Sequence, residues 1–345
     1  MARAAALLIS ALLIVVLGAC ATSHGRTETD VVFTRYSPLS RGAEIARRVL
    51  PPLTYRSVEQ TLVATHQQLA EQSIDLTREK FDIYIPDGPP PAAGYGLLVF
   101  VPPWPGPTRP GAWRGPLDRH RLILVAAQRS GNGSNVLDRR LPLAILAYEN
   151  VRARFPVDDS RVYVSGLSGG SRVAEMAALA YPDIFRGAVL NAGADPIDGQ
   201  NGIYKPPAGL FSAFQRSRLV YITGEHDQGA LLQDDVSERS LREACVLDIR
   251  TELAMGLEHQ ALDARALDQA LDALDEPRAV DPAELARCNA RIEREIAAGL
   301  ADAAAAIARG DRDAARGRLK ALDARFGGLA APGILELDAR LAAQR

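Results

Sequence analysis

One serine in a glycine-rich pentapeptide is the residue of this chain best suited to nucleophilic chemistry. Ser168 lies in Gly166-Leu167-Ser168-Gly169-Gly170, a Gly-x-Ser-x-Gly pattern. Glycines on both sides permit a turn so tight that larger side chains would collide, and such a turn lifts the serine hydroxyl clear of its neighbours. A pattern this short arises by chance in roughly one chain in ten of this length. Its meaning therefore depends on the elements around it.

The segments that flank the pentapeptide are a predicted strand and a predicted helix. Residues 161–165 form a largely apolar run typical of a strand, and Val173, Met176 and Ala180 follow at helical spacing. A helix that begins directly after the serine points its positive N-terminal dipole at the reacting oxygen, where negative charge develops. The strand–turn–helix setting therefore predicts that Ser168 is a catalytic nucleophile.

The residues around the serine also carry a family resemblance. The run DDSRVYVSGLSGG over residues 158–170, with YPDIF over residues 181–185, resembles the polyhydroxybutyrate depolymerase and feruloyl-esterase-like branch of the α/β-hydrolases. The resemblance covers roughly residues 80–275. It implies a serine esterase that forms an acyl-enzyme intermediate on a small or polymeric ester, without a metal or an organic cofactor.

A serine nucleophile needs a base, and the base needs an acid to orient it. In α/β-hydrolases the acid and then the histidine follow the serine along the chain. Of the five histidines, only His226 and His259 follow Ser168. The resemblance places the base at His259, in a loop after the last strand. It places the acid at Asp227, which follows the strand predicted over residues 219–222.

Two other carboxylates compete with Asp227 for the role of the acid. Glu225 lies in the same loop. Asp195 follows the strand predicted over residues 188–190, an alternative acid position in some hydrolases. The sequence leaves both alternatives open.

An oxyanion hole requires two backbone donors, and the sequence supplies the first at the N–H of Gly169. The second is expected in the loop after the strand of residues 96–101, where most relatives carry His-Gly. This chain has Pro-Pro-Trp-Pro-Gly at residues 102–106 instead. Because proline has no N–H, Trp104 is the first residue able to donate, and Gly106 is the next.

Two further features belong to loops near this site. Trp104 and Trp113, in the proline-rich loop, either line the substrate cleft or anchor the loop to the sheet. Residues 130–135, Ser-Gly-Asn-Gly-Ser-Asn, follow a strand at the carboxyl edge where α/β sheets bind ligands. They form either a wall of the pocket or a plain turn.

Strands and helices alternate along the central part of the chain. Short apolar runs predict strands at residues 96–101, 122–126, 161–164, 188–190, 219–222 and 246–249, and an alternating run predicts an edge strand at 81–85. Helical spacing predicts helices at residues 41–50, 58–72, 141–155, 173–180 and 261–274. This alternation predicts the α/β-hydrolase fold, with a mostly parallel sheet covered by helices on both faces.

The composition changes from Glu284 onward to Ala, Arg, Asp and Leu at helical spacing, with breaks at Gly310-Asp311 and Gly327-Gly328. We therefore assign residues 36–278 to the hydrolase domain and residues 279–345 to a helical hairpin with a terminal helix. So few helices bury their apolar faces poorly alone. They are expected to dock on the hydrolase domain or on a protein partner.

The N-terminus predicts export. Residues 4–17 form an apolar run after Arg3, too short to span a bilayer comfortably. It ends in Leu17-Gly18-Ala19-Cys20, which resembles the lipobox of bacterial lipoproteins. The resemblance implies that residues 1–19 are a cleaved signal peptide and that Cys20 is lipidated and binds the membrane. The alternative is an ordinary signal peptide with an incidental cysteine.

The residues that follow Cys20 predict where the protein is retained. Ala21 stands where an inner-membrane retention signal usually has Asp, which by resemblance implies an outer-membrane protein facing the periplasm. Residues 20–35 are expected to form a flexible tether. In this oxidising compartment Cys245 and Cys288, the two remaining cysteines, form a plausible disulfide, and two free buried thiols are the alternative.

The charge distribution argues against a nucleic-acid-binding function. The net charge of −2 is spread along the chain without a basic stripe, so no nucleic-acid-binding surface is indicated. The leading interpretation is an envelope-anchored ester hydrolase. The alternative is a weak or inactive lipoprotein of the same fold that binds a partner through its C-terminal helices.

Overall fold

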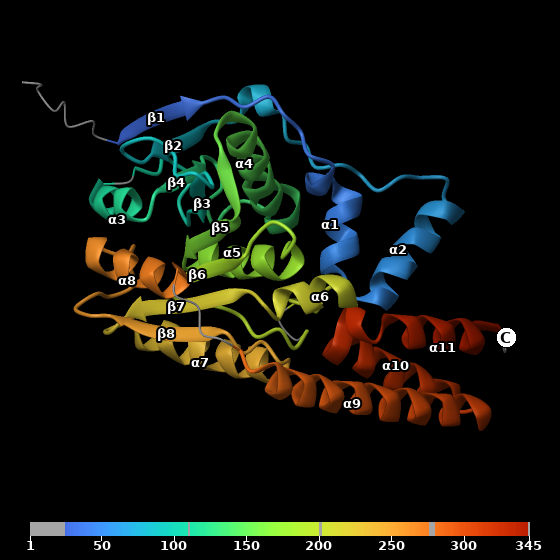
Figure 1. Ribbon diagram of the computed structural model, residues 1–345. Coiled ribbons are helices and arrows are strands. Elements are labelled where there is room, and N and C mark those ends of the chain that lie inside the picture. Colours follow the sequence, from blue (N-terminus) through green and yellow to red (C-terminus); the bar gives the residue numbers. More distant parts are fainter. Residues whose placement is uncertain (1–24, 110, 200–201, 276–279, 344–345) are drawn as a thin grey trace, which may run out of the picture.

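The computed structural model describes residues 25–109, 111–199, 202–275 and 280–343, with strands and helices that alternate along the chain (Figure 1). The strands are β1 (Arg26–Val31), β2 (Phe81–Ile85), β3 (Tyr95–Val101), β4 (Leu122–Ala127), β5 (Val157–Leu167), β6 (Gly187–Asn191), β7 (Arg218–Gly224) and β8 (Ile249–Ala254). The helices are α1 (Gly42–Val49), α2 (Pro52–Ala64), α3 (Arg114–Arg119), α4 (Leu141–Arg154), α5 (Gly169–Ala180), α6 (Ala208–Phe214), α7 (Gln228–Glu243), α8 (Ala264–Asp275), α9 (Pro282–Ala308), α10 (Arg312–Phe326) and α11 (Ala331–Ala343).

The eight strands form one sheet in the order β1-β2-β4-β3-β5-β6-β7-β8. β2 is antiparallel to both β1 and β4, whereas all other neighbours are parallel. Side chains of β3 alternate between two cores: Leu97 and Val99 pack with α4 and α5, and Leu98 and Phe100 pack with α3 and α8. The predicted α/β-hydrolase fold is confirmed.

The N-terminal predictions need three corrections. The expected tether is wrong from Arg26 onward, because Arg26–Val31 pairs with β2 as strand β1. β2 is consequently not an edge strand. The second helix is shifted: it begins at Pro52, where the missing N–H costs nothing, and ends at Ala64 rather than Gln72. The chain leaves the helix at His66, whose backbone φ is 53°.

The other differences between the predicted and the observed elements occur where the side chains show no periodic hydrophobic pattern. The strand expected over residues 246–249 begins only at Ile249. Helix α7 was not predicted, because its buried face carries Asp234 and Ser237 beside Leu241 and so lacks an apolar stripe. The short helices α3 and α6 were also missed.

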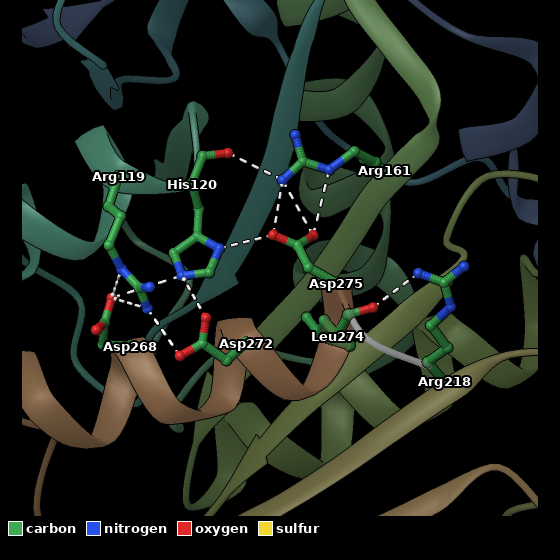
Figure 2. Close-up of polar contacts among 8 residues, drawn as sticks. All are labelled: Arg119, His120, Arg161, Arg218, Asp268, Asp272, Leu274 and Asp275. Atoms are coloured by element: carbon green, nitrogen blue, oxygen red, sulfur yellow. Dashed lines mark hydrogen bonds and ion pairs between the residues drawn. The ribbon is translucent and has the colours of Figure 1, made fainter. Parts of the chain in front are cut away.

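Helix α8 is fixed to the sheet by a cluster of charged side chains (Figure 2). The buried His120 places its Nδ1 2.6 Å from Asp275 Oδ2, and Arg161 donates to the same carboxylate. Arg119 donates to Asp272 and Asp268, one and two turns earlier in the helix. The loop that carries His259 leads directly into α8, so this cluster holds the helix that follows that loop.

Helices α9 to α11 pack on one another and on the hydrolase domain. They share an apolar core, to which α2 contributes Leu53 and the hydrolase domain Cys245. Arg56 donates to the carbonyl of Leu335 at 2.7 Å. A disulfide joins Cys245 to Cys288, with the two Cα atoms 5.8 Å apart. The sequence left open whether these helices dock on the hydrolase domain or on a protein partner. These contacts show that they dock on the hydrolase domain.

The predicted lipobox with Cys20 lies outside the described residues. Among those residues, no helix has both the length and the apolar character needed to cross a membrane.

The disulfide between Cys245 and Cys288 is predicted to stabilise the folded protein. Its 43-residue separation corresponds, in the chain-entropy model, to at most about 4 kcal/mol of the free energy of unfolding. The double variant Cys245→Ser/Cys288→Ser should unfold at lower urea concentration, and reductant should shift the wild type by the same amount. Two alkylatable thiols in the unfolded, unreduced wild type would contradict the bridge.

Candidate active site

Ser168 lies in a strained turn between β5 and α5. Its φ of 57° and ψ of −124° are uncommon for a residue with a side chain. A Cβ atom on Gly166 would lie 2.1 Å from the carbonyl oxygen of Gly170, and one on Gly170 would lie 2.0 Å from that of Val101. Only glycine fits at either position. The turn predicted from the pentapeptide is therefore present, and its strain marks Ser168 as a candidate functional residue.

Asp227 and His259 form a pair at the carboxyl ends of β7 and β8. His259 Nδ1 lies 2.5 Å from Asp227 Oδ2. The other carboxylate oxygen accepts a hydrogen bond from the backbone N–H of Ala230, so Asp227 also caps helix α7. Asp227 is 12% exposed and His259 is 51% exposed. With the Nδ1 proton held by the carboxylate, Nε2 is the nitrogen left to accept a proton.

The two rival carboxylates have other partners. Asp195 accepts from Arg172 Nε at 3.1 Å, and Glu225 accepts from the backbone N–H of Gly256 at 3.0 Å. Within the described residues, neither makes a hydrogen bond or ion pair with His259. The geometry therefore favours Asp227 over both alternatives.

A buried asparagine connects the serine turn with the histidine loop. The N–H of Ser168 donates to the carbonyl of Asn191 at 2.9 Å, and Asn191 Nδ2 donates to the carbonyl of Gln260 at 3.0 Å. Ser168 Oγ itself has no hydrogen bond to His259 in the described part of the chain. Such contacts often tighten only in the substrate complex. Sequence reasoning missed Asn191, although its place directly after an apolar strand was a usable signal.

A cavity of about 490 Å³ opens beside Ser168. Its apolar wall comes mainly from α1, the turn before α4, α5 and the loop after β6, through Leu50, Leu137, Met176 and Ile203. Its polar lining includes Asn132, Tyr204 and the Arg172–Asp195 pair. The loop of residues 130–135 therefore shapes the pocket, as one of its two sequence readings proposed.

The two tryptophans lie outside the lining of this cavity. Trp113 is buried, stacks edge-on against Phe100 and donates from Nε1 to the carbonyl of Leu262 at 2.6 Å. It thereby anchors the loop that carries His259. Trp104 is half-buried and packs against the same core.

Both residues expected to supply oxyanion donors have a backbone N–H that is free to donate within the described residues. Gly169 is the first residue of α5, where an N–H has no partner within the helix. In the proline-rich loop, the carbonyls flanking Trp104 are held: Pro103 accepts from Asn132 N–H and Pro105 from Arg129 N–H. The N–H of Trp104 makes no hydrogen bond within the described residues. It remains able to donate to a substrate.

Two buried acids lie behind the site. Glu175 is fully buried and accepts from the backbone N–H of Asp195 and from Ser237 Oγ. Burial raises the pKa of Glu175 to about 8. Burial also raises the pKa of Asp234 to about 6, while Thr223 Oγ1 donates to it. Sequence reasoning missed both residues, because an isolated acid in a helix is usually exposed.

The strand order is that of the α/β-hydrolase fold. No protein-family model matches the sequence. A segment of 66 residues is 44% identical to the poly(3-hydroxyalkanoate) depolymerase C of Paucimonas lemoignei. The segment covers 19% of this chain and 14% of that protein.

Solved structures share the architecture at low sequence identity. A ferulic acid esterase has a TM-score of 0.47 at 13% identity, over 73% of this chain and 99% of its own. The poly(3-hydroxybutyrate) depolymerase of Bordetella parapertussis has a TM-score of 0.41 at 18% identity, over 61% and 88%. Likeness this distant does not assign an activity to the chain.

The buried Glu175 is predicted to make the stability of the folded protein depend on pH. Its pKa is raised in the folded state, so the folded protein holds a proton that the unfolded chain releases above about pH 4.5. Stability should therefore fall as pH rises from about 4.5 to 8, by up to about 1.4 kcal/mol per pH unit. Glu175→Gln should flatten this fall.

Urea unfolding at several pH values between 5 and 8 measures the effect. Glu59→Gln, at an exposed position on α2, is the control and should keep the wild-type pH dependence. A Glu175→Gln profile parallel to the wild type would contradict the assignment.

Proposed function

We propose that this protein is a serine hydrolase of carboxylic esters with Ser168, His259 and Asp227 as its catalytic triad. The observation that carries the proposal is the 2.5 Å contact between His259 and Asp227 at the sheet edge from which the strained turn raises Ser168. Asn191 supports it, because this side chain links the serine turn to the histidine loop.

The reaction proceeds in two acyl-transfer steps. Ser168 Oγ attacks the ester carbonyl carbon while His259 Nε2 accepts the hydroxyl proton. Collapse of the tetrahedral intermediate breaks the bond to the alkoxy oxygen, which leaves as an alcohol with that proton. Water then attacks the acyl-enzyme, gives a proton to His259, and the returning proton restores Ser168 as the acid departs. Asp227 orients the imidazole throughout.

The N–H groups of Gly169 and Trp104 bind the oxyanion in both steps. Donors of this kind act where negative charge develops and each contributes about 3–4 kcal/mol to the transition state. The hydrogen bonds to the carbonyls of Pro103 and Pro105 support this role, because they hold the loop that carries Trp104.

The substrate class follows from the cavity. Its volume of about 490 Å³ and its aliphatic wall, with Leu137, Met176 and Ile203, suit an apolar acyl or alcohol group. An aliphatic ester is therefore the proposed substrate. The name of the Paucimonas lemoignei relative makes a hydroxyalkanoate polyester a specific candidate within this class.

The proposal includes a location in the cell envelope. The lipobox-like Leu17-Gly18-Ala19-Cys20 supports lipidation of Cys20 and attachment to the outer membrane, with the domain facing the periplasm. The disulfide between Cys245 and Cys288 supports an oxidising compartment.

Substitution of the triad tests the activity. Ser168→Ala and His259→Ala should each lower kcat for p-nitrophenyl ester hydrolysis on the order of 10⁴-fold or more, with little further loss in the double variant. Asp227→Asn should lower it by a smaller but large factor, since the imidazole loses its orienting charge. Glu225→Gln is the control and should stay near wild type.

Two outcomes would contradict parts of this proposal. A large loss in Asp195→Asn without one in Asp227→Asn would move the acid to Asp195. A folded wild type that hydrolyses no ester would favour an inactive protein that binds a partner instead.

Substitution of Cys20 tests the location. In a Gram-negative host, Cys20→Ser should move the protein from the membrane fraction to the soluble fraction, since no acyl chain can be attached. Metabolic labelling with a fatty acid should mark the wild type alone. A membrane-bound wild type without label would contradict lipidation.

A further inference from the structure

Arg140 is a buried arginine whose burial is not compensated by an ion pair within the described residues. It ends the helical turn Val136–Arg140 that precedes α4, and it is 3% exposed. Among the described residues no carboxylate pairs with it, and burial lowers the pKa of its guanidinium to about 10. It therefore stays charged at neutral pH. A buried cation without an anionic partner costs folding free energy, and an apolar side chain of similar size would be more stable there.

The guanidinium donates instead to carbonyls of three separate segments. Nη2 donates to Pro102 at 3.0 Å, Nη1 to Gly169 at 3.1 Å and Nε to Ser130 at 2.8 Å. Pro102 belongs to the loop that carries Trp104, and Gly169 opens helix α5. One rigid planar group thus connects the two segments that supply the oxyanion donors.

The composition of the proline-rich loop explains why it needs such a donor. Proline offers a carbonyl but no N–H, so at Pro102, Pro103 and Pro105 the backbone can be held only through its carbonyls. Asn132 and Arg129 supply backbone donors to Pro103 and Pro105, and Arg140 supplies the donor to Pro102. Of these three, Arg140 is the one that also holds Gly169.

We propose that Arg140 is a positioning residue that sets the separation between the oxyanion donors of Gly169 and Trp104. The inference rests on the proposed function above. Arg140 acts through the carbonyls on either side of the hole and takes no part in proton transfer. Its loss should therefore weaken binding of the transition state much more than binding of the ester.

Steady-state kinetics of Arg140→Ala and Arg140→Lys test this role. Arg140→Ala should lower kcat about 100-fold, as expected for displaced catalytic groups, and leave KM within about threefold. The Ki of a trifluoromethyl ketone, which forms an oxyanion on Ser168, should rise by the factor by which kcat/KM falls. Arg140→Lys should lie between the wild type and Arg140→Ala, since ammonium cannot reproduce the planar fork.

Chemical rescue separates positioning from general loosening of the fold. Arg140 borders the substrate cavity, so added methylguanidinium can reach the vacated space in Arg140→Ala. At millimolar concentration it should restore part of kcat, whereas methylammonium should not. Arg139→Lys is the matched control, because Arg139 donates to the carbonyl of Arg129 and pairs with Glu79 but touches neither donor segment. It should retain wild-type kcat.

The outcomes are distinguishable. Folded Arg140→Ala and Arg140→Lys with kcat within threefold of an active wild type would overturn the role of Arg140 alone. An equal loss in Arg139→Lys would overturn it as well. If Arg140→Ala does not fold, Arg140→Lys decides through the same split between kcat and KM. A wild type that neither hydrolyses esters nor binds the ketone would overturn the proposed function, and the role of Arg140 with it.

Discussion

The backbones of β3, of the turn at Ser168 and of the first turn of α5 approach so closely that no side chain fits between them. A Cβ on Gly170 would overlap the carbonyl of Val101, and one on Gly166 would overlap that of Gly170. Ser168 adopts its unusual backbone conformation at this contact, directly before the first residue of α5. The contact also brings the loop after β3 beside Gly169. The proposed nucleophile and both proposed oxyanion donors therefore depend on the same close approach of backbone segments.

The remaining parts of the site are held by side chains that bind backbone carbonyls of neighbouring loops. Asn191 donates to Gln260, Trp113 donates to Leu262, and Arg140 donates to three segments around Ser168. Loops at the carboxyl edge of a sheet have few mutual backbone hydrogen bonds, so buried donors of this kind fix their relative positions. The charged cluster holds α8, the helix that follows the histidine loop (Figure 2).

Local signals predicted the fold and pointed to the candidate site residues, whereas contacts between residues far apart in the chain could not be predicted from the sequence. Ser168 was selected as a candidate through a pentapeptide between two periodic segments, and Asp227 with His259 through chain order and strand ends. Strand β1 was missed because its pairing with β2 uses backbone groups that leave no hydrophobic pattern. Arg140 was missed for a related reason: its partners lie 10, 29 and 38 residues away, and an arginine is ordinarily expected at the surface.

Fluorophosphonate labelling followed by peptide mass spectrometry tests the central claim most directly. Such a probe reacts with a serine only where a base activates the hydroxyl and donors stabilise the developing charge. The account predicts one adduct per chain, located on Ser168, and a labelling rate that falls steeply in His259→Ala. A correctly folded wild type without an adduct, or with its adduct on another serine, would contradict it.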